Sequence, residues 1–117
     1  MKNSKRISRS IIAVLFFCMT ADVVVAADDA GQAEVYFQNK QYKEALAIWH
    51  QMAAAGDVSA GTYFNIGIAE SRLNNVSGAM LAYEKAKRLQ PGNRLIKNAI
   101  VAERKRIEDA TIPVEPF

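Results

Sequence analysis

The residues that could do chemistry in this chain are few and widely spaced. His50 is the only histidine and Cys18 the only cysteine among 117 residues. A histidine pair for a metal, or a Ser–His or Cys–His nucleophile, therefore cannot be assembled from sequence neighbours. The carboxylates are scattered, and the glycines form no cluster of the kind that cradles phosphate. The sequence predicts no enzyme and no bound metal or cofactor.

The basic residues could instead bind nucleic acid, and the chain has a formal net charge of +3. Four of its 15 Lys/Arg and one of its 12 Asp/Glu lie in residues 1–27, so residues 28–117 carry 11 of each and are neutral. The basic run that remains is Arg104-Lys105-Arg106. Three adjacent basic residues on a helix are expected to be solvated, so nucleic-acid binding is not predicted.

The first 27 residues have the composition of a targeting segment. Its basic start is formed by Lys2, Lys5, Arg6 and Arg9. An apolar run from Ile11 to Met19 follows, and then the small residues Ala26 and Ala27. This order is typical of a secretory signal peptide, so we expect export and cleavage after one of these two alanines. The alternative is an uncleaved membrane anchor, but Asp22 interrupts the apolar stretch before the roughly 20 residues that a spanning helix needs.

The rest of the chain contains an internal repeat with a period of 34 residues. Shifted by that distance without a gap, YKEALAIWHQM at 42–52 aligns with VSGAMLAYEKA at 76–86. The aligned pairs are Ala33 with Gly67, Tyr36 with Glu70, Ala45 with Ala79, Trp49 with Tyr83 and Met52 with Ala86. A fixed period of this size is typical of stacked supersecondary units.

Apolar periodicity and stop signals predict five helices after the targeting segment. They cover about 29–39, 42–55, 59–73, 76–89 and 94–110. Asp57 or Ser59 can cap the third helix, Asn75 the fourth and Asn93 the fifth, because each offers a side-chain oxygen to free backbone N–H groups. The Pro-Gly pair at 91–92 should stop the fourth helix.

The last predicted helix carries an apolar stripe that would close the end of the stack. The stripe consists of Leu95, Ile96, Ala99, Ile100 and Ile107, with charged residues elsewhere. Repeat arrays need a terminal element of this kind to cover the last open face. Residues 111–117 contain two prolines and are expected to form an extended tail.

The second copy of the repeat resembles the tetratricopeptide repeat (TPR), a helix–turn–helix unit. Its matching positions are Tyr63, Ile66, Gly67, Ala79, Tyr83, Ala86 and Pro91, and the first copy matches at Ala33, Tyr36, Ala45 and Trp49. The small Gly67 and Ala79 would let the two helices of a unit approach closely. The resemblance implies an all-α TPR helical solenoid over residues 28–110. Its first repeat would cover about 28–59, its second 60–93, and a capping helix 94–110.

Residues 30–117 resemble, more closely, the TPR module of BatE-type proteins, which are encoded in bacterial aerotolerance (Bat) clusters. The likeness rests on Phe64-Asn65-Ile66-Gly67, on Asn98, and on the closing residues Asp109, Ile112, Pro116 and Phe117. It implies a non-enzymatic scaffold in the bacterial envelope, exported to the periplasm or held at the inner membrane by its N-terminus. Such a scaffold would bind another protein of the envelope or of a membrane complex. The alternatives are a soluble periplasmic adaptor for secretion or pilus assembly, and a structural subunit that self-associates.

The expected partner-binding surface is the inner, concave side of the solenoid. Its predicted residues, called here the concave stripe, are Glu34, Phe37, Gln38, Phe64, Ile68, Arg72, Asn98 and Lys105. They would form a short apolar groove with polar rims for a peptide or a partner helix. The alternative is that Phe37, Phe64 and Ile68 fill the space between repeats. Phe64 and Ile68 also replace the Lys/Asn pattern with which some TPR domains bind a C-terminal carboxylate, so that activity is not expected.

Overall fold

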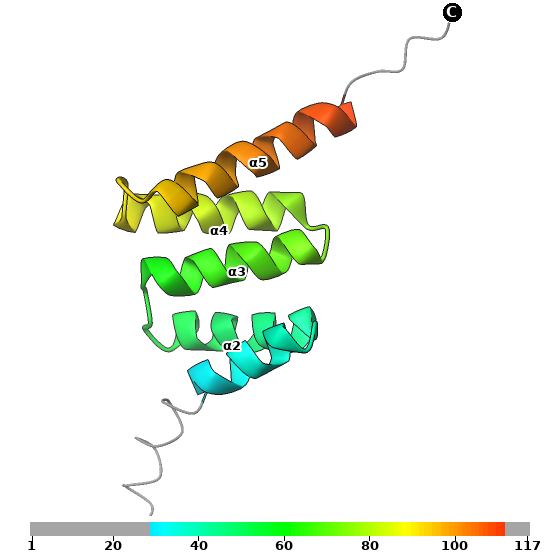
Figure 1. Ribbon diagram of the computed structural model, residues 1–117. Helices are drawn as coiled ribbons and strands as arrows, with labels where there is room; N and C mark the ends of the chain where they lie inside the picture. Colours follow the sequence, from blue (N-terminus) through cyan, green and yellow to red (C-terminus); the bar gives the residue numbers. More distant parts are fainter. Residues whose placement is uncertain (1–28, 112–117) are drawn as a thin grey trace, which may run out of the picture.

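The computed structural model describes residues 29–111, and the regular structure in that range is entirely helical (Figure 1). A first helical segment covers residues 29–38. It is followed by α2 (Tyr42–Ala54), α3 (Ala60–Arg72), α4 (Val76–Leu89) and α5 (Arg94–Thr111). The predicted all-α class is confirmed, and each predicted helix boundary lies within one residue of the observed one. The expected signal peptide at 1–27 lies outside the described residues, as does the expected tail at 111–117 apart from Thr111, which is the last residue of α5 and not extended.

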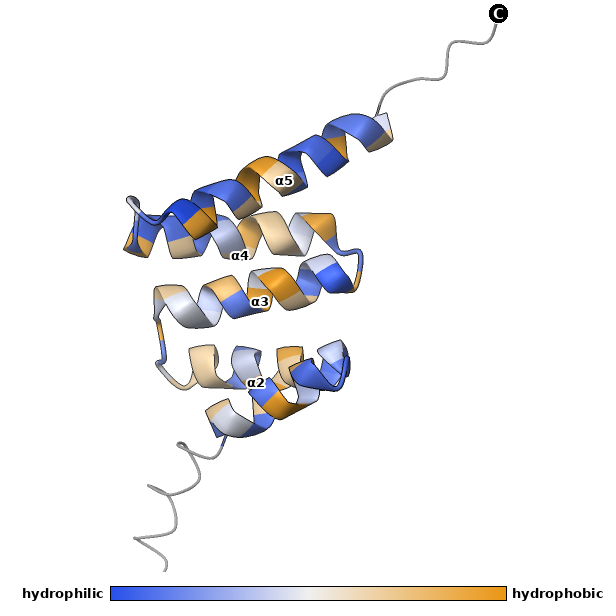
Figure 2. Ribbon diagram, viewed as in Figure 1, coloured by the Kyte–Doolittle hydropathy of each residue, from blue (hydrophilic) through white to orange (hydrophobic). Residues whose placement is uncertain are grey.

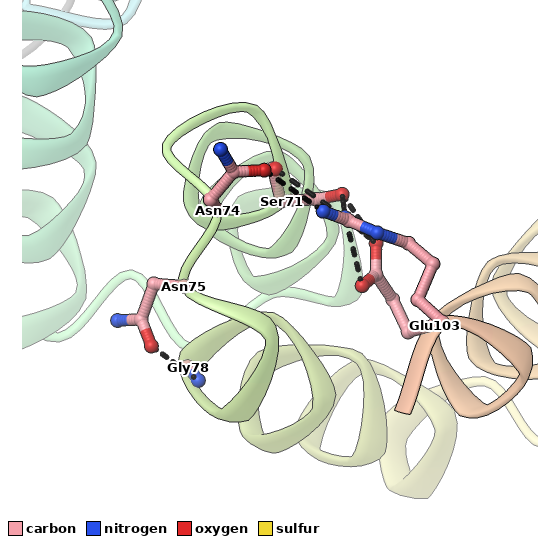
Figure 3. Close-up of polar contacts among 6 residues, drawn as sticks. Ser71, Asn74, Asn75, Gly78 and Glu103 are labelled. Atoms are coloured by element: carbon pink, nitrogen blue, oxygen red, sulfur yellow. Dashed lines mark hydrogen bonds and ion pairs between the residues drawn. The ribbon is translucent and has the colours of Figure 1, made fainter. Parts of the chain in front are cut away.

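Polar side chains cap the helices as the sequence predicts. Ser59 Oγ accepts a hydrogen bond from the backbone N–H of Thr62 at 3.1 Å, at the start of α3. Asn75 Oδ1 accepts one from the third residue of α4 at 3.1 Å (Figure 3). Asn93 Oδ1 accepts two from the first turn of α5, at 3.0 and 3.4 Å. Asp57, the alternative cap for α3, instead accepts from the hydroxyl of Thr62 at 2.9 Å.

The helices stack in the order of the sequence. α3 packs against both α2 and α4, and α4 packs against α5. In Figure 1 the first helical segment lies beside α2 at the lower end of the stack, and α5 closes the upper end. Each helix is therefore covered mainly by its neighbours in the chain, an arrangement that places α3 at the centre.

Two apolar clusters, built mostly from alanine, hold this stack together. The first joins the first helical segment to α2, α3 and α4 through Ala33, Ala45, Trp49, Ile66, Ala69 and Ala82. The second joins α3, α4 and α5 through Ala60, Ala79, Tyr83, Ala86, Ile96 and Ile100. Because alanine has a single methyl group, neighbouring helix axes can come close together. The few large side chains then fill the space that remains between the helices.

The tightest packing at a glycine occurs between α3 and α4. A Cβ atom built on Gly67 would lie 2.4 Å from Cε1 of Tyr83, whereas ordinary van der Waals contact begins at 3.4 Å. Any side chain at this position would therefore displace the buried tyrosine ring. The large side chain at position 83 thus requires a glycine at position 67.

The predicted apolar stripe of α5 is wrong at two of its five positions. Ile96 and Ile100 are buried and Ala99 is half-buried, but the exposed fractions of Leu95 and Ile107 are 67% and 40%. Glu103, which the prediction placed outside the stripe, is buried instead, with only 4% exposed. Leu95 is next to Ile96 in the chain and therefore lies about 100° around the helix from it, facing away from α4. Ile107 is exposed because α5 diverges from α4 along its length (Figure 1). The distal half of α5, mostly hydrophilic in Figure 2, therefore meets the polar end of α3.

Candidate functional site

Four polar residues converge where the end of α3 meets α5, and we call them the α3–α5 polar cluster: Ser71, Asn74, Glu103 and Arg106 (Figure 3). The hydroxyl of Ser71 donates to Glu103 Oε1. Arg106 Nη1 donates to Ser71 Oγ at 2.9 Å and to Glu103 Oε2 at 3.1 Å. Arg106 Nη2 donates to Asn74 Oδ1 at 2.9 Å.

The α3–α5 polar cluster binds one helix to another and leaves no reactive group free. The carboxylate of Glu103 is buried, and a buried charge needs this kind of pairing to offset its lost hydration. Arg104 and Lys105 in the basic run at 104–106 are exposed, whereas Arg106, with 40% of its side chain exposed, also bonds to Ser71, Asn74 and Glu103. Glu103 is seven residues after Ile96, on the same face of the helix, and that spacing was the sequence signal for its burial.

Tyr83 is a buried titratable residue whose pKa is affected by Glu103 and Arg106 of this cluster. Its exposed fraction is 4%. Burial, and to a smaller extent the negative charge of Glu103, raise the pKa of Tyr83 to about 12 against the opposing effect of Arg106 and Arg72. The phenol is therefore neutral in the folded protein at ordinary pH, and its ring serves as packing against Gly67.

The polar members of the concave stripe are all exposed or half-exposed: Glu34, Gln38, Arg72, Asn98 and Lys105. Two of them are joined, since Gln38 Nε2 donates to Glu34 Oε1 at 2.7 Å. Arg72 ends α3, whereas Asn98 and Lys105 lie on α5. The depression that Lys105 lines is formed, within the described range, by α5 residues alone.

The apolar members of the concave stripe are half-buried and pack on the two clusters. The ring of Phe37 lies edge-on to Tyr42, with centroids 5.2 Å apart, and 5.8 Å from Trp49. The ring of Phe64 is 5.7 Å from that of Tyr83, and Ile68 packs on the same cluster. Phe37, Phe64 and Ile68 therefore contribute to the core, and only part of each side chain is open to a partner.

A second depression lies between α2 and α4, over α3, and has a volume of about 340 Å³. We call it the α2–α4 groove, and its lining residues are His50, Ala53, Ala54, Tyr63, Ile66, Glu70, Gly78, Leu81, Ala82 and Lys85. None of them belongs to the concave stripe. Sequence reasoning missed this groove because its walls come from three helices, and their spacing is set by packing rather than by any local motif.

The polar groups of the α2–α4 groove contact one another and the ring of Tyr63. His50 Nε2 lies 3.7 Å from Glu70 Oε1, and Asn75 Nδ2 donates to Glu70 Oε2 at 2.7 Å. The ammonium of Lys85 lies 5.4 Å from the ring centroid of Tyr63. No serine, threonine or cysteine is among the residues that line the groove beside His50. Residues 29–111 contain no group of three His, Cys, Asp or Glu side chains that could hold a metal ion.

The described helices also lack a membrane-spanning segment, since none of them combines the required length with sufficient apolar character. Comparison with known protein families finds no family model that matches the chain, and comparison with curated proteins finds no matching sequence.

Proposed function

We propose that this protein is a non-enzymatic interaction module of TPR type, exported to the bacterial envelope and similar to BatE, that binds another protein. The observation that carries the proposal is the fit of Gly67 against Tyr83. These are the two TPR positions at which the pattern demands a missing side chain and a large ring, and a Cβ on Gly67 would lie only 2.4 Å from that ring. If the sequence matched the pattern only by chance, the packing would not be expected to require a glycine at position 67.

The burial of the other pattern positions supports the same repeat unit. Ala33, Ala45, Ala79 and Ala86 have no exposed surface. Trp49, which is equivalent to Tyr83 in the first repeat, is 4% exposed, the same fraction as Tyr83 itself. The small and the aromatic positions thus occupy the same kind of environment in both copies, as stacked repeats require.

The concave stripe is the surface that we assign to the partner. It combines exposed charged and amide side chains with the accessible parts of Phe37, Phe64 and Ile68, and this composition fits an interface with a small apolar centre and a polar rim. Two repeats also form a short array, and repeat proteins generally need three or more for stability. Support from a partner protein fits that requirement.

Photo-crosslinking in the native host tests this function. A photoreactive amino acid in place of Arg72, an accessible residue of the concave stripe, should give a discrete adduct with one envelope protein. The same substitution at Lys43, exposed on α2 and outside the stripe, is the matched control and should give none. Adducts of equal yield from both positions, or none from Arg72, would contradict the proposal.

The identity of the adduct separates the alternatives. A neighbouring membrane protein with a von Willebrand-type A domain supports a BatE-like role, and a secretion or pilus component supports a periplasmic adaptor. An adduct of the chain with itself, together with a stable oligomer in analytical ultracentrifugation, identifies a self-associating structural subunit.

A further inference from the structure

The floor of the α2–α4 groove is apolar, and one large apolar side chain at its edge remains in water. Ile66 and Ala82 are buried beneath the groove, with 3% and 4% exposed, and Tyr63 is half-buried beside them. Leu81, at the edge, is 59% exposed although it lies on the helix that forms one wall. A ligand seated in the groove would therefore remove both the floor and Leu81 from water, which favours binding.

The accessible charge of the groove is positive. The carboxylate of Glu70 is already engaged, with one oxygen accepting from Asn75 at 2.7 Å and the other 3.7 Å from His50. Its side chain is only 13% exposed. Lys85 is exposed, and within residues 29–111 no carboxylate oxygen lies within 4.0 Å of its ammonium. The groove thus presents one cation whose charge an incoming ligand can neutralise.

Local packing holds these polar groups in place. The Tyr63 ring, 5.4 Å from the Lys85 ammonium, attracts the cation through its π-face and keeps it at the edge of the groove. Nearer the start of the same helix, a Cβ on Gly78 would lie 2.6 Å from Asn75 Nδ2 and 2.9 Å from Cδ of Glu70. A side chain there would displace the Asn75–Glu70 pair, so the glycine permits the hydrogen bond that holds the Glu70 carboxylate.

We infer that the α2–α4 groove is a second binding surface, for a short segment of a partner protein that carries a large apolar side chain next to a carboxylate. The inference rests on the proposed role as an interaction module and adds a surface outside the concave stripe. The apolar side chain fills the floor beside Leu81, and the carboxylate pairs with Lys85. A volume of about 340 Å³ is at the small end of ligand pockets, and it suits one or two side chains of a peptide. A single cation is too little for a nucleic acid, whose affinity comes from many phosphate contacts.

Selection from a random peptide library displayed on phage tests this inference with the full chain as bait. The unaltered protein should enrich peptides with Asp or Glu beside Leu, Ile, Phe or Trp. Lys85→Glu reverses the accessible charge at an exposed position and should replace the acidic residue in the enriched peptides by Lys or Arg. Lys43→Glu, the same charge reversal on an exposed lysine outside the groove, should leave the enriched motif unchanged.

The affinity of one selected peptide then locates its binding site. Leu81→Ala should weaken binding about tenfold, or about 1.4 kcal/mol, and circular dichroism should show unchanged helicity because Leu81 is exposed. Arg72→Glu, in the concave stripe, should have no effect. The inference is overturned if no motif is enriched, if Lys85→Glu selects the same motif, or if Arg72→Glu alone abolishes binding. In this last case the interaction module stands and only the groove is rejected, while crosslinking from position 72 tests the module independently.

Discussion

Tyr83 combines packing and electrostatics in a single side chain. Its ring fills the space left by Gly67, lies 5.7 Å from the ring of Phe64, and shares a buried cluster with Ile96 and Ile100. This burial removes the phenol from water, and its pKa rises because the charged phenolate would be poorly hydrated. Because Tyr83 packs between α3 and α4, its ionisation should make the stability of the fold depend on pH in the alkaline range.

The stability of the protein should fall between pH 10 and pH 12. The pKa of Tyr83 is about 12 in the folded protein and 10.0 as the reference value for an unfolded chain. Above pH 10 the unfolded state therefore loses its proton first, and the free energy of unfolding decreases as pH rises towards 12. The expected slope is about 1.4 kcal/mol per pH unit within this window. Urea denaturation at a series of pH values measures it.

The matched control for this titration is Tyr83→Phe, which keeps the ring and removes the ionisable hydroxyl. The free energy of unfolding of the variant should decline less steeply across the same window, since its remaining decline comes from other groups. Equal slopes in the two proteins would show that Tyr83 is not responsible.

At the scale of the helices, α5 is attached in two different ways. Its first half packs through Ile96 and Ile100 on the apolar cluster, whereas its second half is bound by the α3–α5 polar cluster. Arg106 is central to that cluster, because it donates to residues at the end of α3 and to Glu103. The distal half of α5, which carries Lys105 of the concave stripe, is therefore held by the guanidinium of Arg106 together with the Ser71–Glu103 hydrogen bond.

Arg106→Ala should destabilise the protein by about 1–3 kcal/mol, because it leaves the buried carboxylate of Glu103 with fewer hydrogen bonds. The effect should be local, so amide hydrogen exchange in the distal half of α5 should accelerate before exchange in α3 or α4. Arg104→Ala is the matched control, since Arg104 is exposed and its loss should change stability by less than about 0.5 kcal/mol. Similar destabilisation and exchange in the two variants would refute the role of the polar cluster.

For the molecule as a whole, α3 links the two apolar clusters and separates the two candidate surfaces. Ile66 and Ala69 face the first cluster, and Ala60 belongs to the second. Phe64 and Arg72 contribute to the concave stripe, while Tyr63 and Glu70 line the α2–α4 groove. A small module can in this way offer two distinct surfaces to partners, provided that it is delivered to the compartment where the partners are.

Export of the protein should be detectable from the N-terminal residue of the processed chain. The basic start, apolar run and small residues of 1–27 predict that the protein begins at Ala27 or Asp28 after processing in its native host. Mass spectrometry of the purified protein identifies the N-terminal residue from the mass of the chain. Leu15→Arg, which places a charge in the apolar run, is the control and should remain unprocessed. A chain that retains Met1 and fractionates with membranes would instead support the uncleaved anchor.

The positions of the helices were determined by the sequence itself, because the forces that start and stop a helix act over a few residues. Ser59, Asn75 and Asn93 cap the helices that follow them, as their side-chain chemistry predicts. The small and aromatic positions of the 34-residue period likewise supply half of the buried apolar residues, because the same residue types recur wherever two helices approach closely.

The tertiary structure alone decided which face of each helix is covered and where a surface is hollow. Ile107 is exposed because α5 diverges from α4, and Glu103 is buried because the same helix passes the end of α3; the angle of α5 depends on side chains from three helices at once. The half-burial of Phe64 and the shape of the α2–α4 groove likewise depend on how several helices pack together. Helical periodicity places residues on one face of one helix, but it carries no information about the distance or angle to the next helix. That geometry emerges only when the whole core is packed.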